Sequence, residues 1–213
     1  TAEFFIAETN RQVLGRVAVL HHRNYCAHHQ RQTAFFYLFE CVDEIEVARK
    51  LLDAAADWAR KQGLDHIYGS KGFLRSHGQG ILVEGFSEPP DMGIPYNPPY
   101  YAKLLEANGF NKETDFYSGT MLKSQPIGEK IHQVAKRVKE KGNFWVKTFR
   151  SNREISEWIP HVESVHASAF ATNPNYIPST PEEFALLAKT MIQIAEPGMI
   201  KLIMKGDEVA GFV

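Results

Sequence analysis

The chain has 213 residues, with 24 Lys and Arg against 25 Asp and Glu, and a formal net charge of -1 at pH 7. A charge this close to zero creates no overall field that would recruit nucleic acid or a membrane, so we expect neither as a partner. The two cysteines and the lack of an apolar run long enough to cross a bilayer predict a cytoplasmic protein.

The first elements predicted are two strands, residues 4–8 and 13–20, joined by a polar turn into an antiparallel hairpin. Residues 21–29 then hold four histidines and Cys26. Their spacings match no familiar zinc pattern. We therefore predict a polar connection at 21–29 and no metal site.

An unbroken apolar and aromatic run, residues 35–39, predicts a central strand covered on both faces. Asp43 and Glu46 follow with the spacing of a capping box, which predicts the start of a helix there. Gly63 supplies its end. One side of this helix carries apolar residues at spacings of three and four, namely Val47, Ala48, Leu51, Leu52, Ala55, Trp58 and Ala59. Residues 64–69 predict a strand that returns parallel to the first.

The segment 70–99 is rich in glycine, proline and aromatic residues and shows little periodicity. A connection of this length is either a functional lid or a rigid loop that covers the sheet, and the sequence supports both equally. Pro98 and Pro99 predict the start of a short helix. Residues 116–122 predict a further strand.

The second half begins with a predicted linker helix, residues 126–142, that has an apolar stripe and several basic residues on another face. We interpret that basic face as solvated rather than as a nucleic-acid patch, because glutamates are interspersed and aromatic residues are absent. A strand at 144–149, a helix that begins near Ser151 and is interrupted at Pro160, a helix that begins at Thr180 and a closing hairpin complete the chain.

The sequence also contains an internal repeat. Residues 13–17 align with residues 209–213, and each segment follows a polar turn of the same length. Both are the second half of a predicted hairpin. This pattern indicates two copies of one module.

The order of predicted elements resembles the GNAT superfamily of N-acetyltransferases. The segments GRVAVLHHRN, FFYLFECVDEIEVARKLLDAAADWARKQG, GILVEGF and IPYNPPYYAKLLEANGF resemble a widespread group of bacterial GNAT-like proteins. The resemblance implies an α+β fold, a three-layer sandwich in which helices flank a mixed, mostly antiparallel and twisted sheet. Residues 1–125 resemble the module from its second strand to its end, 126–142 form the linker helix, and 143–213 resemble the start of a second module.

The same resemblance implies an acyl-CoA-dependent N-acyltransferase, or part of one, that uses acetyl-CoA or another acyl-CoA. The acceptor would be an amine of a small molecule or peptide. The implied catalytic residues are Glu40 as base and Tyr101 as acid, although the residues themselves favour Glu40 as a strand-end carboxylate in water or paired with an arginine. The other implied site residues are Phe39, Cys41, Val42 and Ala48 for the cofactor, and Tyr96, Asn97 and Tyr100 in the substrate loop.

The turn before the long helix departs from the superfamily pattern. Active relatives place glycines there, whose bare backbone cradles a pyrophosphate. Here Asp43 and Glu46 occupy that turn. An alternative function follows, in which the module has lost CoA binding and serves as a binding or interface domain. Unpaired sheet edges would then favour a homodimer.

Overall fold

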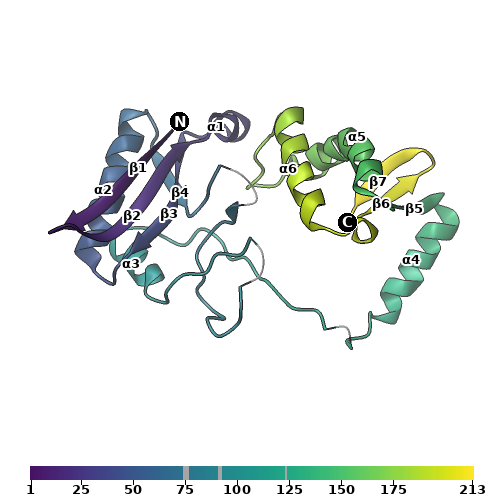
Figure 1. Cartoon of the computed structure of the whole chain (residues 1–213), viewed down its shortest axis with the longest axis horizontal. Helices are drawn as coiled ribbons and strands as arrows, with labels where there is room; N and C mark the ends of the chain where they lie inside the picture. Colours follow the sequence, from purple (N-terminus) through teal and green to yellow (C-terminus); the bar gives the residue numbers. More distant parts are fainter. Residues whose placement is uncertain (74–76, 91–92, 123) are drawn as a thin grey trace. The chain divides into compact units, whose positions relative to one another are not determined.

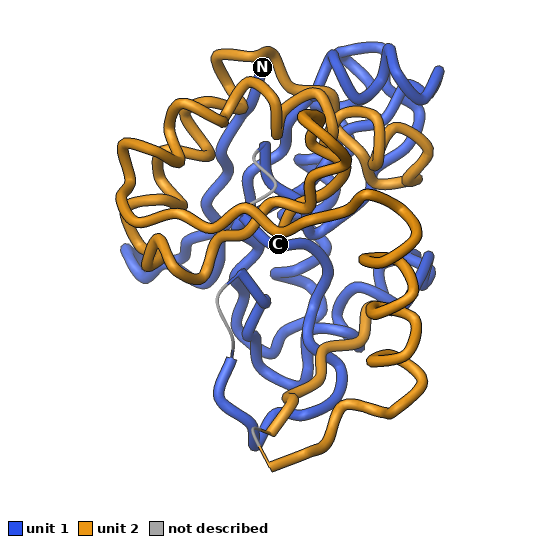
Figure 2. Tube along the Cα trace, turned by 90° about the vertical axis from the view of Figure 1, so that its right-hand side faces the viewer, with its two compact units in different colours: residues 1–115 blue, residues 116–213 orange. Residues whose placement is uncertain are grey.

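The chain forms two compact units, Thr1–Asp115 and Phe116–Val213 (Figures 1 and 2). The structure, a computed structural model, describes residues 1–73, 77–90, 93–122 and 124–213. Both units combine helices with a sheet whose strands pair mostly antiparallel, which confirms the predicted α+β class. Among the described residues, no helix combines the length and apolar character needed to cross a membrane.

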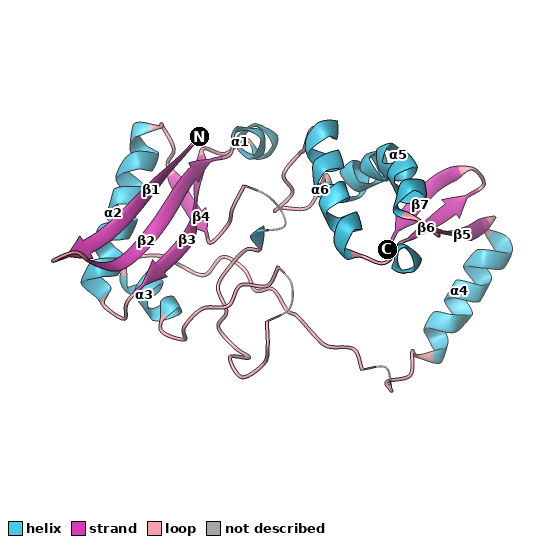
Figure 3. Cartoon of the chain, in the orientation of Figure 1, coloured by secondary structure: helices cyan, strands magenta, loops and turns pink. Residues whose placement is uncertain are grey.

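Unit 1 is built on a four-stranded sheet (Figure 3). The strands lie in the order β1 (Ala2–Thr9), β2 (Gln12–His21), β3 (Thr33–Cys41) and β4 (His66–Gly69). The first three pair antiparallel, and β4 pairs parallel to β3. The predicted hairpin, central strand and parallel return are therefore confirmed.

Helix α2 (Ile45–Lys61) covers one face of this sheet. Its buried side chains are Val47, Ala48, Leu51, Leu52, Ala55 and Ala59, which are members of the predicted stripe. The predicted capping box is wrong: Glu44 is the N-cap residue and makes no side-chain cap bond, while Glu46 pairs with Arg49 one turn further on. The short i,i+3 ion pair competes for the carboxylate that the capping box would need.

The other face of the sheet carries the short helix α1 (Arg23–His29), where the sequence predicted only a polar connection. The ring of Tyr25 packs edge-on against Phe35, with 4.8 Å between centroids. The Cys26 thiol donates to the backbone oxygen of Thr33 over 3.3 Å. Tyr25 and Cys26 are thus apolar anchors of one helical turn, and no cluster suited to a metal occurs among the described residues.

The central strand β3 contains a bulge. Its pairing with β2 shifts register between Arg16 and Ala18, so that two residues of β3 lie opposite Val17. Leu38, one of those two, has a φ of 52°, in the left-handed region that a leucine rarely adopts. On its other edge, β3 pairs with β4 only as far as Phe36 opposite Gly69. The edge of β3 beyond Phe36 is therefore open to groups other than a neighbouring strand.

Helix α3 (Tyr101–Ala107) buries Tyr101, Leu104 and Leu105 in the same core as α2. The predicted strand at 116–122 does not form, and its residues are exposed. A strand exists only where it can pair, and no neighbouring strand runs beside this segment in the described part of the chain.

Unit 2 is organised on a three-stranded antiparallel sheet of order β5-β6-β7. Its elements are α4 (Glu129–Lys141), β5 (Phe144–Thr148), α5 (Asn152–Phe170), α6 (Pro181–Ile194), the 3-10 turn η2 (Pro197–Met199), β6 (Lys201–Lys205) and β7 (Glu208–Phe212). Ser151 caps α5, and Thr180 with Glu183 forms the capping box of α6. Helix α5 continues through Pro160, so the proline does not split it, and a kink there stays a prediction.

The hairpins β1–β2 and β6–β7 have the same pairing, residue for residue. Both shift register at the same place, between Ala7 and Glu8 and between Ile203 and Met204. The matching pairs are Ile6–Arg16, Ala7–Gly15, Glu8–Val13 and Thr9–Gln12 in β1–β2, and Leu202–Phe212, Ile203–Gly211, Met204–Val209 and Lys205–Glu208 in β6–β7. The repeat seen in five residues of sequence therefore extends to the pairing of the β6–β7 hairpin and of the turn end of the β1–β2 hairpin.

The two hairpins differ in what covers them. Leu202 is 1% exposed and packs in the core formed with α5 and α6. Ile6, at the matching position in unit 1, is 65% exposed. The same backbone thus carries an apolar side chain that is buried in one unit and open in the other.

This difference in burial predicts that truncation to alanine lowers the free energy of unfolding by different amounts at the two matching positions. Leu202→Ala should lower the free energy of unfolding of unit 2 by about 2–5 kcal/mol, because it removes buried methyl groups and leaves a cavity. Ile6→Ala should change that of unit 1 by less than about 1 kcal/mol, because its side chain is already in water. Urea unfolding followed by circular dichroism measures both, and equal losses would contradict the different burial of the two hairpins.

Candidate active site at the open end of the central strand

A hollow of about 310 Å³ lies where β2 and β3 run on beyond the bulge and meet the start of α3. Its lining residues are Val13, Leu14, Gly15, Arg16, Glu40, Cys41, Val42, Tyr100 and Tyr101. Five of the residues proposed from sequence therefore come together here: Glu40, Cys41, Val42, Tyr100 and Tyr101. We take this hollow as the candidate active site.

Two tyrosine hydroxyls bind the open edge of β3. The backbone N–H of Cys41 donates to the Tyr101 hydroxyl over 3.1 Å, and the Tyr100 hydroxyl donates to the backbone oxygen of Cys41 over 3.0 Å. The next residue, Val42, donates its N–H in the opposite direction, to Leu14 of the β2 side. The tyrosines thus satisfy backbone groups that a further strand would otherwise pair.

The two hydroxyls have opposite roles in their hydrogen bonds to Cys41, one as acceptor and one as donor. Burial raises the pKa of Tyr101 and of Tyr100, so both stay protonated at neutral pH. Tyr100 uses its proton in the bond to the Cys41 oxygen, whereas Tyr101 is the acceptor in its bond and keeps its proton for another partner. Tyr101 is therefore the better placed of the pair to donate a proton into the hollow.

The thiol of Cys41 is unsuited to nucleophilic chemistry. Burial, with the nearby carboxylates of Glu44 and Asp43 adding to it, raises the pKa of Cys41 to about 11. The thiolate is the reactive form, and almost none is present near pH 7. The structure therefore gives Cys41 no role as a covalent nucleophile near neutral pH.

Glu40 has the arrangement that the sequence allowed as the alternative to a base. Its carboxylate pairs with Arg16 across the β2–β3 ladder, with 2.7 Å between Nη2 and Oε1. The two side chains are 62% and 50% exposed. Such a pair contributes no more than about 1 kcal/mol to stability, so the carboxylate can exchange this partner for a substrate at small cost.

Phe39 and Ala48, two residues proposed for cofactor binding, belong to the core. The Phe39 ring packs against Tyr101 at 5.3 Å between centroids, and Ala48 is fully buried on the face of α2 that packs in the core. Neither side chain lines the hollow.

Of the proposed substrate-loop residues, Tyr100 lines the hollow, whereas Tyr96 and Asn97 brace the loop itself. The Asn97 side chain is buried and bonds both the N–H and the oxygen of Leu82, at 2.7 and 3.2 Å. The Tyr96 hydroxyl donates to the backbone oxygen of Phe86 over 3.0 Å. These bonds favour the rigid-loop interpretation for residues 77–90 and 93–99, and parts of the proposed loop at 74–76 and 91–92 lie outside the described residues.

Sequence reasoning missed the contribution of β2, above all Gly15. A Cβ at Gly15 would lie 2.6 Å from the backbone oxygen of Glu40 and 2.9 Å from the side chain of Leu51, so only glycine fits between β3 and α2. A glycine inside a strand is a recognisable sign of close backbone approach. That sign, together with Gly211 at the matching position of the second hairpin, could have pointed to the site.

The N-terminus of α2 has the wrong charge for an anionic ligand. Asp43, Glu44 and Glu46 lie at or just before its first turn, and Arg49 is engaged with Glu46. At ~4 Å and an effective dielectric near 20, a carboxylate and a phosphate oppose each other by about 4 kcal/mol. The residues present therefore do not fit a CoA pyrophosphate at this turn.

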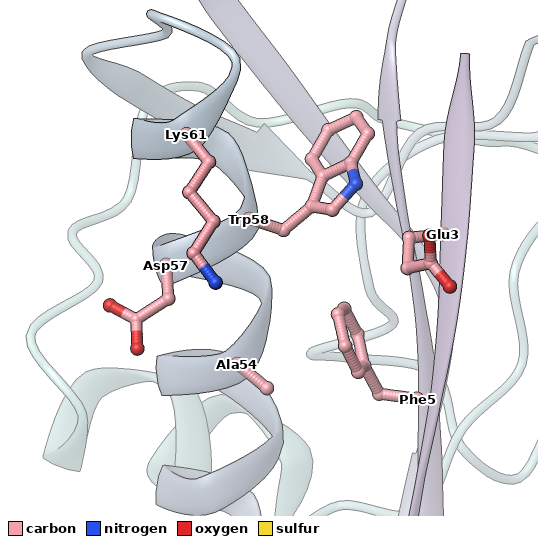
Figure 4. Close-up of a pocket in the computed structure, with 6 residues that line it drawn as sticks. All are labelled: Glu3, Phe5, Ala54, Asp57, Trp58 and Lys61. Carbon is pink, nitrogen blue, oxygen red and sulfur yellow. The ribbon is translucent and has the colours of Figure 1, made fainter.

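A second hollow, of about 350 Å³, lies between α2 and β1. Figure 4 shows the rings of Trp58 and Phe5 between the helix and the strand, with Asp57 and Lys61 on the helix beside them. Asp57 is paired with Arg60. This hollow contains none of the residues proposed from sequence and lies on strand β1 rather than at the open edge of β3.

Comparison with known proteins finds two distant relatives. The chain is 25% identical over 207 residues to Protein YghO of Escherichia coli (strain K12), which covers 92% of this chain and 50% of that protein. It is 25% identical over 186 residues to Bacterial ceramide synthase of Caulobacter vibrioides (strain NA1000 / CB15N), which covers 86% and 47%. The chain spans about half the length of these relatives. No family model and no solved structure matches it.

The bond between Tyr101 and Cys41 predicts a stability change. Tyr101→Phe leaves the buried N–H of Cys41 without its acceptor, and should lower the free energy of unfolding of unit 1 by about 1–3 kcal/mol. Tyr117→Phe is the matched control, because Tyr117 is 93% exposed and should change nothing measurable. Urea unfolding tests both, and an unchanged midpoint for Tyr101→Phe would mean that the bond does not form.

The raised pKa of Cys41 predicts slow alkylation. In a Cys26→Ala variant, iodoacetamide should modify Cys41 at pH 8 more than about a hundredfold more slowly than it modifies free cysteine, because so little thiolate is present. The rate should rise steeply toward pH 11 while the chain stays folded. Mass spectrometry of timed samples measures the rate, and modification as fast as that of free cysteine would refute the assignment.

Proposed function

We propose that the protein is an N-acyltransferase, or part of one, which joins an acyl group from a thioester such as an acyl-CoA to an amine. The observation that carries the proposal is the hollow at the end of β3, where Glu40, Cys41 and Tyr101 come together on a strand that β4 leaves unpaired beyond Phe36. A ligand amide that displaced the tyrosine hydroxyls could pair with the Cys41 backbone as a further strand would. The resemblance of the sequence motifs to N-acetyltransferases agrees with it.

The name of one relative supports the same reaction class. A ceramide is an amide formed between a fatty acyl group and a long-chain amino alcohol, and that relative is a Bacterial ceramide synthase. We extend this to the present chain as a proposal for its acceptor: an amine carried on a long aliphatic chain.

Two residues of the hollow, Tyr101 and Glu40, would then each carry out one of the two proton transfers that the reaction needs. The amine attacks the thioester carbonyl, the C–N bond forms, the C–S bond breaks, and the thiol leaves with a proton. Tyr101 would supply that proton from its uncommitted O–H. Glu40, once released from Arg16, would take the proton that the amine loses.

A second function is favoured by the carboxylates at the start of α2. Asp43, Glu44 and Glu46 oppose a CoA pyrophosphate there, which suits a module that has lost CoA binding and serves as a binding or interface domain. In that case any acyl transfer would take place outside unit 1, and unit 1 would serve as the binding or interface domain.

Calorimetric titration of acetyl-CoA into the chain separates these functions. For the transferase we expect binding, and Asp43→Asn should raise the affinity about tenfold by removing one opposing charge. Asp53→Asn, further along α2 and exposed, is the control and should leave affinity unchanged. No heat at millimolar acetyl-CoA in either the parent or Asp43→Asn would favour the interface domain.

The role of Tyr101 is tested by turnover. With acyl-CoA and a long-chain amino alcohol such as sphinganine, Tyr101→Phe should lower kcat about a hundredfold and leave KM nearly unchanged, as expected for loss of a general acid. Tyr100→Phe, which removes a hydroxyl whose proton is already engaged, should retain most activity. Release of free CoA thiol gives the rate, and equal losses in the two variants would reject the assignment.

A further inference from the structure

Helix α4 exposes an apolar stripe to solvent along its whole length. Ile131 is 62% exposed, Val134 51% and Val138 44%, and no residue of the helix is buried. The helix leads into β5 and stands apart from α5 and α6, which lie together (Figures 1 and 3). An aliphatic stripe of this kind normally faces a core or another apolar phase.

The stripe is narrow and continuous. At about 100° per residue, Ile131, Val134, Ala135 and Val138 fall within an arc of roughly 100°. This is the width with which a helix lies flat on an apolar surface.

The charged residues of α4 are sorted around that stripe. Lys130, Arg137, Lys139 and Lys141 lie on its two flanks, roughly 70–110° from its centre. Glu129 and Glu140 lie at the opposite pole, roughly 170° from the centre. The helix therefore carries five basic residues, Lys136 being the fifth, against two acidic ones, within a chain whose net charge is -1.

This arrangement discriminates between partners. Long basic side chains on the flanks can bury their aliphatic stems and reach outward to phosphates at the level of the interface, while the glutamates stay in water. A partner helix of another protein would instead be matched by charges of both signs next to the stripe. Here both flanks carry positive charge only.

We propose that α4 is a membrane-surface helix, which lies in the interface of an anionic phospholipid bilayer with Ile131, Val134 and Val138 inserted among the acyl chains. This goes beyond the expectation from net charge that the chain has no membrane partner. The local charge of the helix, rather than that of the chain, decides the interaction because fields decay within about 10 Å in salt. The proposal does not depend on the acyltransferase function.

Co-sedimentation of the full chain with vesicles tests this surface. The chain should sediment with vesicles of mixed phosphatidylglycerol and phosphatidylcholine, and about tenfold more weakly with phosphatidylcholine alone. High salt should reduce the binding to the mixed vesicles. Val134→Asp should reduce it about tenfold or more, because it places a charge among the acyl chains.

Matched controls lie on the same helix. Gln133→Asp introduces the same charge on the water side and should bind nearly as the parent does. Arg137→Glu on a flank should weaken binding several-fold more than Lys136→Glu, which lies close to the glutamate pole. All these positions are exposed, so circular dichroism should show an unchanged fold.

Three results would overturn the proposal. The first is no sedimentation of the folded chain with anionic vesicles. The second is equal binding by Val134→Asp and Gln133→Asp. The third is a parent chain that is dimeric in analytical ultracentrifugation, becomes monomeric on Val134→Asp and ignores vesicles, which would assign the stripe to a second copy of the chain.

Discussion

The structure of the candidate site depends on one departure from regular pairing in β3. The bulge at Leu38 puts an extra residue on the β3 side of the β2–β3 ladder, and β4 ends just before it. A bulge changes the direction of the strand and increases its twist, so a neighbour that pairs before the bulge cannot stay in register after it. The half of β3 that is paired on both edges therefore gives way, within two residues, to a half whose second edge has no strand neighbour.

An open edge in the middle of a domain needs partners for its backbone groups. Tyr100 and Tyr101 supply them without adding a strand, because their hydroxyls reach the Cys41 N–H and oxygen from the start of α3. Hydroxyls can be displaced by a ligand amide more readily than a whole strand can. The same contacts that stabilise the empty site thus keep it accessible.

Much of the fold could be predicted from the sequence, because it rests on periodicity and composition. The stripe of α2, the central strand and the hairpins follow directly from the spacing of apolar residues. The bulge could not be predicted, since Leu38 sits inside an apolar run and nothing marks its positive φ. The prediction of a capping box at Asp43 was wrong because Glu46 pairs with Arg49 instead. Residue spacing alone cannot tell which of these two interactions Glu46 makes.

The candidate site was predicted in part. Glu40, Cys41 and the two tyrosines meet in the hollow because they flank the same strand end, which the element order already implies. Ala48 and Asn97 were assigned to a ligand by alignment with a motif, whereas their burial places them in the core and in a loop brace. A residue's role depends on which way its side chain points, and that is decided by three-dimensional packing.

Two of the exposed apolar surfaces in the described part of the chain pose different physical problems. Phe4 and Ile6 on β1 match Ile200 and Leu202 of the second hairpin, which pack in the core with α5 and α6. The positions of Phe4 and Ile6 on β1 therefore correspond to positions that a layer of helices covers in unit 2. The stripe of α4 has no such counterpart, and its flanks carry uniform positive charge that a protein core would leave without partners. Burial in protein would suit the first surface, whereas the charge around the second suits the anionic membrane surface proposed above.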